Sequence, residues 1–312
     1  MTWLKVTGIG LLAIVAVAFG IDRYYDQERS DLTDAVRQAA GGSYVRLPDG
    51  VAHYQVAGPD SGRVVVLVHG FSTPYYIWDP MFDDLAKAGF RVVRYDLYGR
   101  GYSDRPSVEY NADLFDRQLA NLLAALKIPG PVDVAGLSMG GAVVETFANR
   151  HPDKTRSVIL VDPVASRGGR QPWTLHVPVL RDWVMTVLVA PTMAAGQLSD
   201  FHHPERFPDW PARYAVQMRY RGFRHAILST LLASEHRDVT LEYPGVGKLG
   251  LPVLLIWGKE DHTVPFALSE GIRKAIPQAE FHPIDDAGHI PYMEQPEVVN
   301  PIVIQFLRRL HK

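Results

Sequence analysis

The chain has 312 residues, of which 47% are hydrophobic and 21% are charged, and its formal net charge is −2 at pH 7. This composition is typical of one large globular domain, or of one domain with an insertion, and it excludes a disordered chain. The near-neutral charge provides no field that would attract nucleic acid, and the lack of cysteine excludes disulfides, thiolate nucleophiles and cysteine-based zinc sites.

An apolar run at residues 6–21 follows Lys5. Its length of about 16 residues lies between the core of a signal peptide and the roughly 20 residues that span a bilayer. Residues 22–34 have the pattern of a helical stalk, which favours a membrane anchor at residues 3–21. A signal peptide cleaved at the A-x-A pattern of residues 16–18 is the alternative. Lys5 favours a cytoplasmic N-terminus, so we expect the rest of the chain on the extracytoplasmic side, either anchored there or secreted or periplasmic after cleavage.

From residue 43 onward, short strands alternate with amphipathic helices. Residues 44–47 and 51–56 indicate a hairpin, and the β-branched run Val64–Val68 predicts a strand buried on both faces. Repeated strand–helix–strand units imply an α/β fold with a mainly parallel central sheet and helices on both faces. Further strands are predicted at 91–95, 132–135, 157–161, 253–257 and 280–283, and helices at 81–88, 114–126, 139–149, 266–276 and 296–310.

The alternation stops between Pro163 and Gly250, where helical patterns rich in aromatic residues are interrupted by proline and glycine. We interpret this segment as a helical cap inserted after the sixth strand, because long insertions at loops often form lids. The predicted organisation is an N-terminal anchor or signal peptide with its stalk at 1–42, a core at 43–162 and 251–312, and a cap at 163–250.

The sequence Gly136-Leu137-Ser138-Met139-Gly140 follows a predicted strand and begins a predicted helix. This is the setting of a nucleophile elbow, in which a sharp turn exposes the serine hydroxyl. The glycines two positions before and after Ser138 leave room for the turn, and the helix N-terminus favours developing negative charge. The pattern therefore predicts Ser138 as a nucleophile.

An acyl-transfer mechanism also needs two preorganised donors for the oxyanion. The backbone N–H groups of Phe71 and Met139 are the candidates, because one follows the strand at 64–68 and the other follows the nucleophile. We expect His69 to brace the loop and not to titrate in catalysis. Ser72 is either a further hydroxyl donor or a surface residue.

A serine nucleophile needs a base to accept its proton. Of the twelve histidines, His289 lies in a loop between the last predicted strand and the last helix, at the sheet edge where Ser138 is also expected. His262 is the main rival. His202 and His203 in the cap suggest a metal site, but no third ligand has suitable spacing, so we predict neither a metal nor an organic cofactor.

An acidic residue should orient the base and stabilise its charged form. Asp261 follows the strand at 253–257 and is the preferred candidate, and Asp162, which follows the preceding strand, is the second choice. Glu260 is one residue out of register. Asp285 and Asp286 are interpreted as loop carboxylates.

These motifs together resemble the α/β-hydrolase superfamily. They are H-G-F-S at 69–72, D-L-Y-G-R-G-Y-S-D at 96–104, G-L-S-M-G-G at 136–141, W-G-K-E-D-H-T-V-P at 257–265 and A-G-H-I-P at 287–291. The resemblance covers residue 43 to the C-terminus and has the family's Ser…Asp…His order. It implies the α/β-hydrolase fold and a triad of Ser138, Asp261 and His289, and a structural role in a loop for Asp96.

The resemblance is less specific for substrate. Haloalkane dehalogenases and epoxide hydrolases carry aspartate where this chain has Ser138. Carbon–carbon hydrolases of aromatic-ring degradation often have asparagine before the nucleophile and tryptophan after the histidine, where this chain has Leu137 and Ile290. We expect a small-molecule substrate, a carboxylic ester of an apolar acyl group, with monoacylglycerol-type lipids included. The alternatives are a hydrolase of meta-cleavage products, a haloperoxidase-like or perhydrolase-like enzyme, and a ligand sensor without activity.

Overall fold

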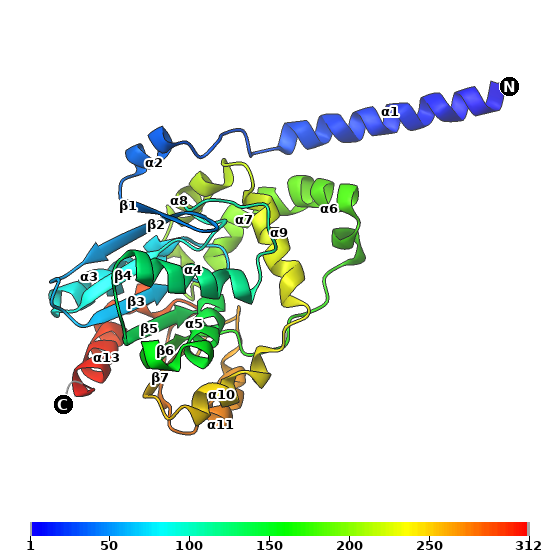
Figure 1. Ribbon diagram of the computed structural model, residues 1–312. Coiled ribbons are helices and arrows are strands. Elements are labelled where there is room, and N and C mark those ends of the chain that lie inside the picture. The colour runs from blue at the N-terminus through cyan, green and yellow to red at the C-terminus, as the bar shows by residue number, and fades with distance from the viewer. Residues whose placement is uncertain (1, 311–312) are drawn as a thin grey trace.

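The computed structural model describes residues 2–310, apart from the side chains of residues 2–6, 8 and 11. Its centre is an eight-stranded sheet with the order β1-β2-β4-β3-β5-β6-β7-β8 (Figure 1). The first two strands pair antiparallel, β2 also pairs antiparallel with β4, and all other neighbours are parallel. The strands are β1 (Ser43–Leu47), β2 (Gly50–Ala57), β3 (Val64–Val68), β4 (Arg91–Tyr95), β5 (Val132–Leu137), β6 (Thr155–Val161), β7 (Val253–Gly258) and β8 (Glu280–Ile284).

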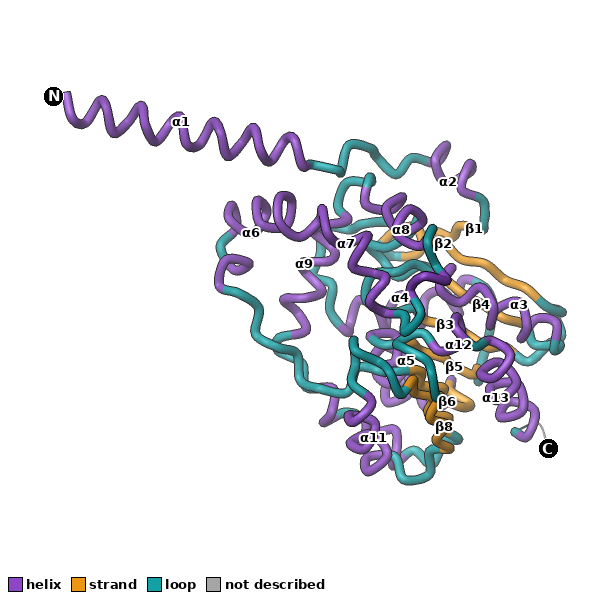
Figure 2. Tube along the Cα trace, turned by 180° about the vertical axis from the view of Figure 1, so that it is seen from behind, coloured by secondary structure: helices purple, strands orange, loops and turns teal. Residues whose placement is uncertain are grey.

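Helices cover both faces of the sheet (Figures 1 and 2). Because side chains alternate along a strand, Val66 and Val68 of β3 belong to one hydrophobic cluster, and Val65 and Leu67 belong to another on the opposite face. The first cluster includes residues of α4 (Ala112–Ala125), α5 (Met139–Arg150) and α11 (Ser269–Ala275), and the second includes residues of α3 (Asp79–Lys87), α12 (Pro291–Glu294) and α13 (Pro296–Arg309). The α/β class and the mainly parallel sheet predicted from the sequence are confirmed.

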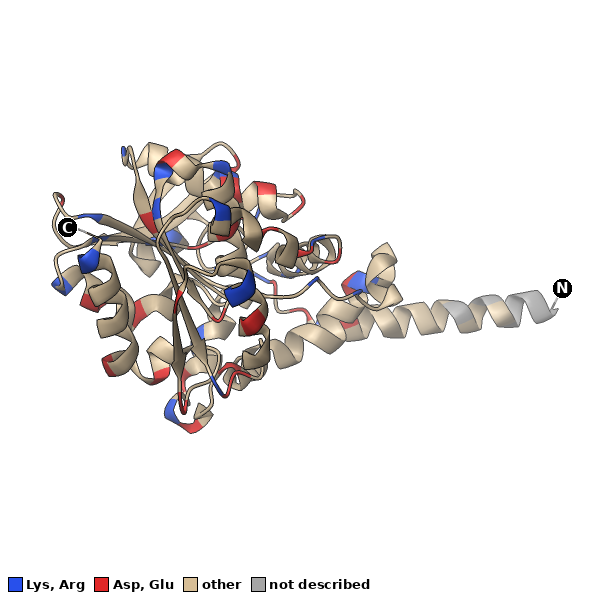
Figure 3. Cartoon of the chain, turned by 90° about the horizontal axis from the view of Figure 1, so that it is seen from below, with Lys and Arg blue, Asp and Glu red and all other residues tan. Residues whose placement is uncertain are grey.

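The fully described segment between β6 and β7 contributes helices and no strand to the sheet. Its main helices are α6 (Pro178–Val184), α7 (Ala190–Gly196), α8 (Trp210–Met218), α9 (Phe223–Ser234) and α10 (Tyr243–Lys248). Residues such as Tyr214, Met218 and Phe223 form a hydrophobic cluster separate from the two at the sheet, and Phe71 of the core packs against it. Acidic and basic residues are intermingled over the body of the molecule (Figure 3). The boundaries of the cap stay a prediction.

The N-terminal helix α1 (Thr2–Tyr25) projects away from the body of the molecule (Figure 1). Among the described residues, no helix combines the length and apolar character needed to cross a bilayer. The predicted transmembrane anchor at residues 3–21, and the membrane-anchored location that depended on it, are therefore wrong. At 1.5 Å per residue, a run of about 16 apolar residues covers roughly 24 Å, which is less than the ~30 Å hydrocarbon core.

Residues 26–33 are also not the helical stalk that the sequence suggested. The chain there is irregular until α2 (Asp34–Ala40) begins. Ser30 exchanges backbone hydrogen bonds with the segment after α8, and Glu28 accepts hydrogen bonds from the backbone N–H groups of Gly222 and Arg224. The segment after α1 is thus attached to the helices of the cap.

Candidate active site

Ser138 occupies a strained turn between β5 and α5. Its backbone has φ 55° and ψ −122°, a conformation that is uncommon for residues other than glycine. The turn is held by hydrogen bonds from Ser138 N to Val161 O (3.0 Å) and from Val164 N to Ser138 O (3.1 Å). A Cβ atom on Gly136 would lie 2.2 Å from Gly140 O, so the backbone passes too closely for a side chain. Strain at a serine between a strand and a helix is what the elbow motif predicts.

His289 and Asp261 form a buried pair at the same end of the sheet. Nδ1 of His289 lies 2.7 Å from Oδ2 of Asp261, and the other carboxylate oxygen accepts hydrogen bonds from the backbone N–H groups of Thr263 and Val264. Burial alone lowers the pKa of His289. The hydrogen bond and the negative charge of Asp261 outweigh burial, so the pKa of His289 is raised above its ordinary value.

Ser138 and His289 line one cavity of about 230 Å³. Ser138 follows β5, Asp261 follows β7 and His289 follows β8, so all three lie beyond the carboxyl ends of parallel strands. The cap contributes Gln197 and Asp200 to the same cavity. The structure therefore brings together the three residues that the sequence selected for a triad.

The two predicted oxyanion donors also lie beside Ser138. Phe71 and Met139 line a second cavity with it, of about 250 Å³. The loop of Phe71 approaches the elbow closely, because a Cβ atom on Gly70 would lie 3.2 Å from Ser138 Cβ. In the described part of the chain, neither the N–H of Phe71 nor that of Met139 donates to a protein acceptor. Both groups are free to bind a negatively charged oxygen.

The rival acid and base occupy different surroundings. Asp162 is buried and accepts a hydrogen bond from Gly258 N (2.8 Å). Burial first, and then the charge of Asp261, raise the pKa of Asp162 well above its ordinary value. His262 is exposed to solvent and does not line the cavity of Ser138. Of the two acid candidates, Asp261 is the one in hydrogen-bond contact with His289.

His69 is a buried residue at the end of β3. Its Nε2 accepts a hydrogen bond from Leu97 N (2.9 Å), and its Nδ1 lies 2.9 Å from Gly70 O. Burial lowers the pKa of His69 to about 4, so the ring is neutral at pH 7. A neutral imidazole that joins two loops fits the bracing role expected from the sequence.

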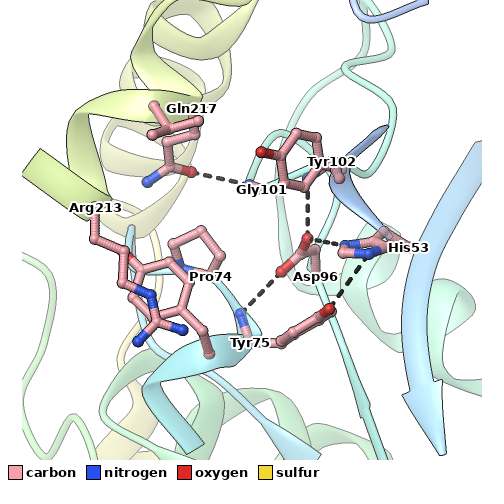
Figure 4. Close-up of a pocket in the computed structure, with 11 residues that line it drawn as sticks. His53, Pro74, Tyr75, Asp96, Gly101, Tyr102, Arg213 and Gln217 are labelled. Carbon is pink, nitrogen blue, oxygen red and sulfur yellow. Dashed lines mark hydrogen bonds and ion pairs between the residues drawn. The ribbon is translucent and has the colours of Figure 1, made fainter. Parts of the chain in front are cut away.

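Asp96 connects three segments beside a separate cavity of about 220 Å³ (Figure 4). Its carboxylate accepts hydrogen bonds from the backbone N–H groups of Tyr75 (2.8 Å) and Tyr102 (2.9 Å), and Oδ2 lies 2.7 Å from Nδ1 of His53. Ser138 and His289 do not line this cavity. These contacts agree with the structural role implied for Asp96, but no local pattern in the sequence pointed to His53.

The sequence also missed Asp200. Its backbone oxygen accepts a hydrogen bond from His289 N (2.8 Å), and its Oδ1 accepts one from the hydroxyl of Thr263 (2.7 Å). Burial raises the pKa of Asp200 above its ordinary value. This cap residue therefore contacts both loops that carry the His289–Asp261 pair. Asp200 and His289 are 89 positions apart, so no local sequence pattern indicated that they are in contact.

Comparison with known proteins places the chain among hydrolases of one fold. A family model described as "alpha/beta hydrolase fold" matches residues 63–296. Lipase 3 of Moraxella sp. (strain TA144) is 26% identical over 279 residues, which cover 86% of this chain and 83% of that protein. The 2-hydroxy-6-oxononadienedioate/2-hydroxy-6-oxononatrienedioate hydrolase of Paraburkholderia xenovorans (strain LB400) is 26% identical, with coverage of 88% and 97%. The crystal structure of the enol-lactonase from Burkholderia xenovorans LB400 matches with a TM-score of 0.73 and 27% identity, over 85% of this chain and 100% of that one.

Proposed function

Because the chain belongs to the α/β-hydrolase family, we propose that it is a serine hydrolase that cleaves carboxylic esters of apolar acyl groups. The observation that carries the proposal is the strained Ser138, which shares a cavity with an imidazole paired to a buried carboxylate. A lipase and an enol-lactonase among the similar proteins support an ester substrate.

In the proposed mechanism, Oγ of Ser138 attacks the ester carbonyl while Nε2 of His289 accepts its proton. Asp261 holds the ring through Nδ1 and stabilises the imidazolium. The backbone N–H groups of Phe71 and Met139 stabilise the oxyanion. His289 then protonates the leaving alcohol, and it later activates the water that hydrolyses the acyl-enzyme. No step in this sequence calls for a metal or an organic cofactor.

The two cavities that meet at Ser138 differ in character. The larger is lined mainly by apolar groups, among them Met139, Val164 and Leu231, and suits the acyl chain. The other includes Gln197, Asp200 and Thr263 and suits the leaving alcohol. At about 250 Å³, the apolar cavity is below the roughly 300–1,000 Å³ of common ligand pockets. We therefore expect short acyl groups, and monoacylglycerol-type lipids only when their acyl chain is short.

A carbon–carbon hydrolase is the second candidate, because one similar protein acts on a dienedioate. Arg167 and Arg237 line the apolar cavity and could meet a substrate carboxylate. However, Arg237 is already paired with Glu242 at 2.8 Å and with Glu145 at 3.3 Å. A cation that is already neutralised attracts an anionic substrate weakly, and Arg167 is exposed to solvent, where its charge is screened. The ester therefore remains the favoured substrate.

The test combines a fluorophosphonate probe with a substrate panel. We expect the wild-type chain to be labelled and to hydrolyse p-nitrophenyl esters, and Ser138→Ala to lose both properties. Ser107→Ala, at an exposed loop position, is the matched control and should behave as the wild type. Labelling with turnover of a meta-cleavage diketone, but not of esters, would favour the second candidate. A wild type that neither reacts nor turns over any substrate would favour a ligand sensor.

A further inference from the structure

Two adjacent histidines of the cap meet an aspartate of the loop that carries His289. Nε2 of His203 lies 2.9 Å from Oδ1 of Asp286, and Nε2 of His202 lies 3.4 Å from the same oxygen. The three ligand atoms are all within 4.8 Å of one another. We propose that His202, His203 and Asp286 form a binding site for a divalent transition-metal ion of the zinc type.

The spacing suits a tetrahedral ion. Zinc bonds of roughly 2.0–2.1 Å to nitrogen and oxygen place neighbouring ligand atoms about 3.3 Å apart. The contact of His202 with Asp286 already has this length at 3.4 Å, and that of His203 at 2.9 Å needs to widen by only a few tenths of an ångström. Imidazole nitrogen and carboxylate oxygen are ordinary zinc ligands, and a water molecule would complete the tetrahedron. Sequence analysis found no third ligand near His202 and His203, because Asp286 lies 83 positions away from His203.

The groups around the ligands prepare them for an ion. Oε1 of Glu205 lies 3.4 Å from Nδ1 of His203. A carboxylate on one ring nitrogen favours the tautomer whose other nitrogen, here Nε2, can bind a metal. The side chains of all three ligands are partly exposed, which leaves a path for the ion.

The positive charge of Arg206 opposes metal binding, because it interacts electrostatically with the Asp286 carboxylate. Repulsion from this cation weakens binding of a second positive charge, and less so as salt increases. We therefore expect neutralising Arg206 to tighten metal binding, and to do so more at low salt than at high salt.

A bound ion would join two segments on which His289 depends. Asp286 lies three residues before His289, and His289 N donates to Asp200 O, two residues before His202. Glu294 already connects the same segments, because it accepts hydrogen bonds from His203 N (2.9 Å) and Gly288 N (2.6 Å). The ion would thus hold the start of the cap segment 200–205 against the loop 285–289.

The test titrates Zn²⁺ and Co²⁺ into the full chain after chelator treatment and removal of the chelator. We expect one equivalent of Zn²⁺ to bind, a rise in Tm, and a visible Co²⁺ absorption typical of tetrahedral sites. His203→Gln and Asp286→Asn should abolish the Co²⁺ signal. Glu205→Gln should weaken Zn²⁺ binding by roughly 10–100-fold, as expected when a partner of a ligand histidine is lost.

His176→Gln is the matched control, because His176 is another partly exposed histidine with a carboxylate partner, Glu235 at 3.3 Å. It should bind Zn²⁺ as the wild type does, and the Tm of every variant without metal verifies that it folds. No saturable binding at millimolar Zn²⁺, or binding that is unchanged in His203→Gln and Asp286→Asn, overturns the proposal. Binding that is lost only in His289→Gln would place the ion at the His289–Asp261 pair and would also overturn it.

Discussion

The carboxyl groups of Asp162 and Asp261 lie within 4.8 Å of each other, beyond the ends of the neighbouring strands β6 and β7. Two buried carboxylates this close cannot both be charged without a large cost in free energy. Burial first, and then the negative charge of Asp261, raise the pKa of Asp162 well above its ordinary value. The two carboxyls therefore differ, because the pKa of Asp162 is raised and Asp261 is the one that contacts His289.

This difference predicts different effects for two similar substitutions. Asp162→Asn keeps an oxygen that can accept from Gly258 N and leaves the contact between His289 and Asp261 in place, so kcat/KM for a p-nitrophenyl ester should stay within about threefold of the wild type. Asp261→Asn should lower kcat by roughly 10⁴-fold, the loss known for the equivalent change in a serine protease triad. Steady-state kinetics of both variants is the measurement. Equal losses would show that the two carboxyls act as one unit.

The His289–Asp261 pair also predicts a pH dependence. His289 must be neutral to accept the proton of Ser138, and its pKa is raised above 6.5 in the folded protein. The value of kcat/KM should therefore rise with pH and level off above an apparent pKa higher than 6.5. Lys259→Gln, at an exposed position with no contact to the pair, should leave the profile unchanged. A profile that is flat from pH 5 to 9 would exclude His289 as the base.

Local sequence was sufficient for the elbow but not for its surroundings. Ser138 was predictable because strand, turn glycines and helix are adjacent in the chain, and His289 because loops after parallel strands meet at one sheet edge. His53 and Asp200 reach their partners through packing of distant segments, which no local period encodes. The anchor prediction was wrong because it gave more weight to the apolar composition of residues 6–21 than to the length of this run, which is too short to cross the hydrocarbon core.

The turn glycines should be intolerant of any side chain. A Cβ atom on Gly140 would lie 2.2 Å from the backbone oxygen of Val68, and the strand cannot move away without breaking its ladder. We expect Gly140→Ala to lower the free energy of unfolding by about 3 kcal/mol or more. Gly271→Ala, in helix α11 with open space around its Cβ position, should instead stabilise by up to roughly 1 kcal/mol. Urea denaturation compares the two, and equal stabilities would contradict the close packing at the elbow.

His69 predicts a loss of stability in acid. Its pKa is about 4 in the folded protein and 6.5 when unfolded, so the unfolded chain binds the extra proton between these values. Its contribution is fully present above pH 6.5 and falls by roughly 3 kcal/mol as the pH drops to 4. His289 has the opposite sign, because its folded pKa is raised. Urea denaturation of His69→Gln across this range should show a shallower acid loss than the wild type, and identical slopes would rule out a buried neutral His69.

The apolar cavity beside Ser138 should set the preferred length of the acyl chain. Leu231 lines this cavity, so Leu231→Phe reduces its volume of about 250 Å³. Because one methylene in an apolar pocket changes transition-state binding by roughly 10–200-fold, kcat/KM for p-nitrophenyl hexanoate should fall at least tenfold relative to p-nitrophenyl acetate. Leu241→Phe, at a position that is 76% exposed, is the control and should leave the ratio unchanged. Because acetate barely enters the cavity, a parallel loss for both esters in Leu231→Phe would indicate damage to the oxyanion donors. Wild-type values of kcat/KM for both esters would mean that the acyl chain binds elsewhere.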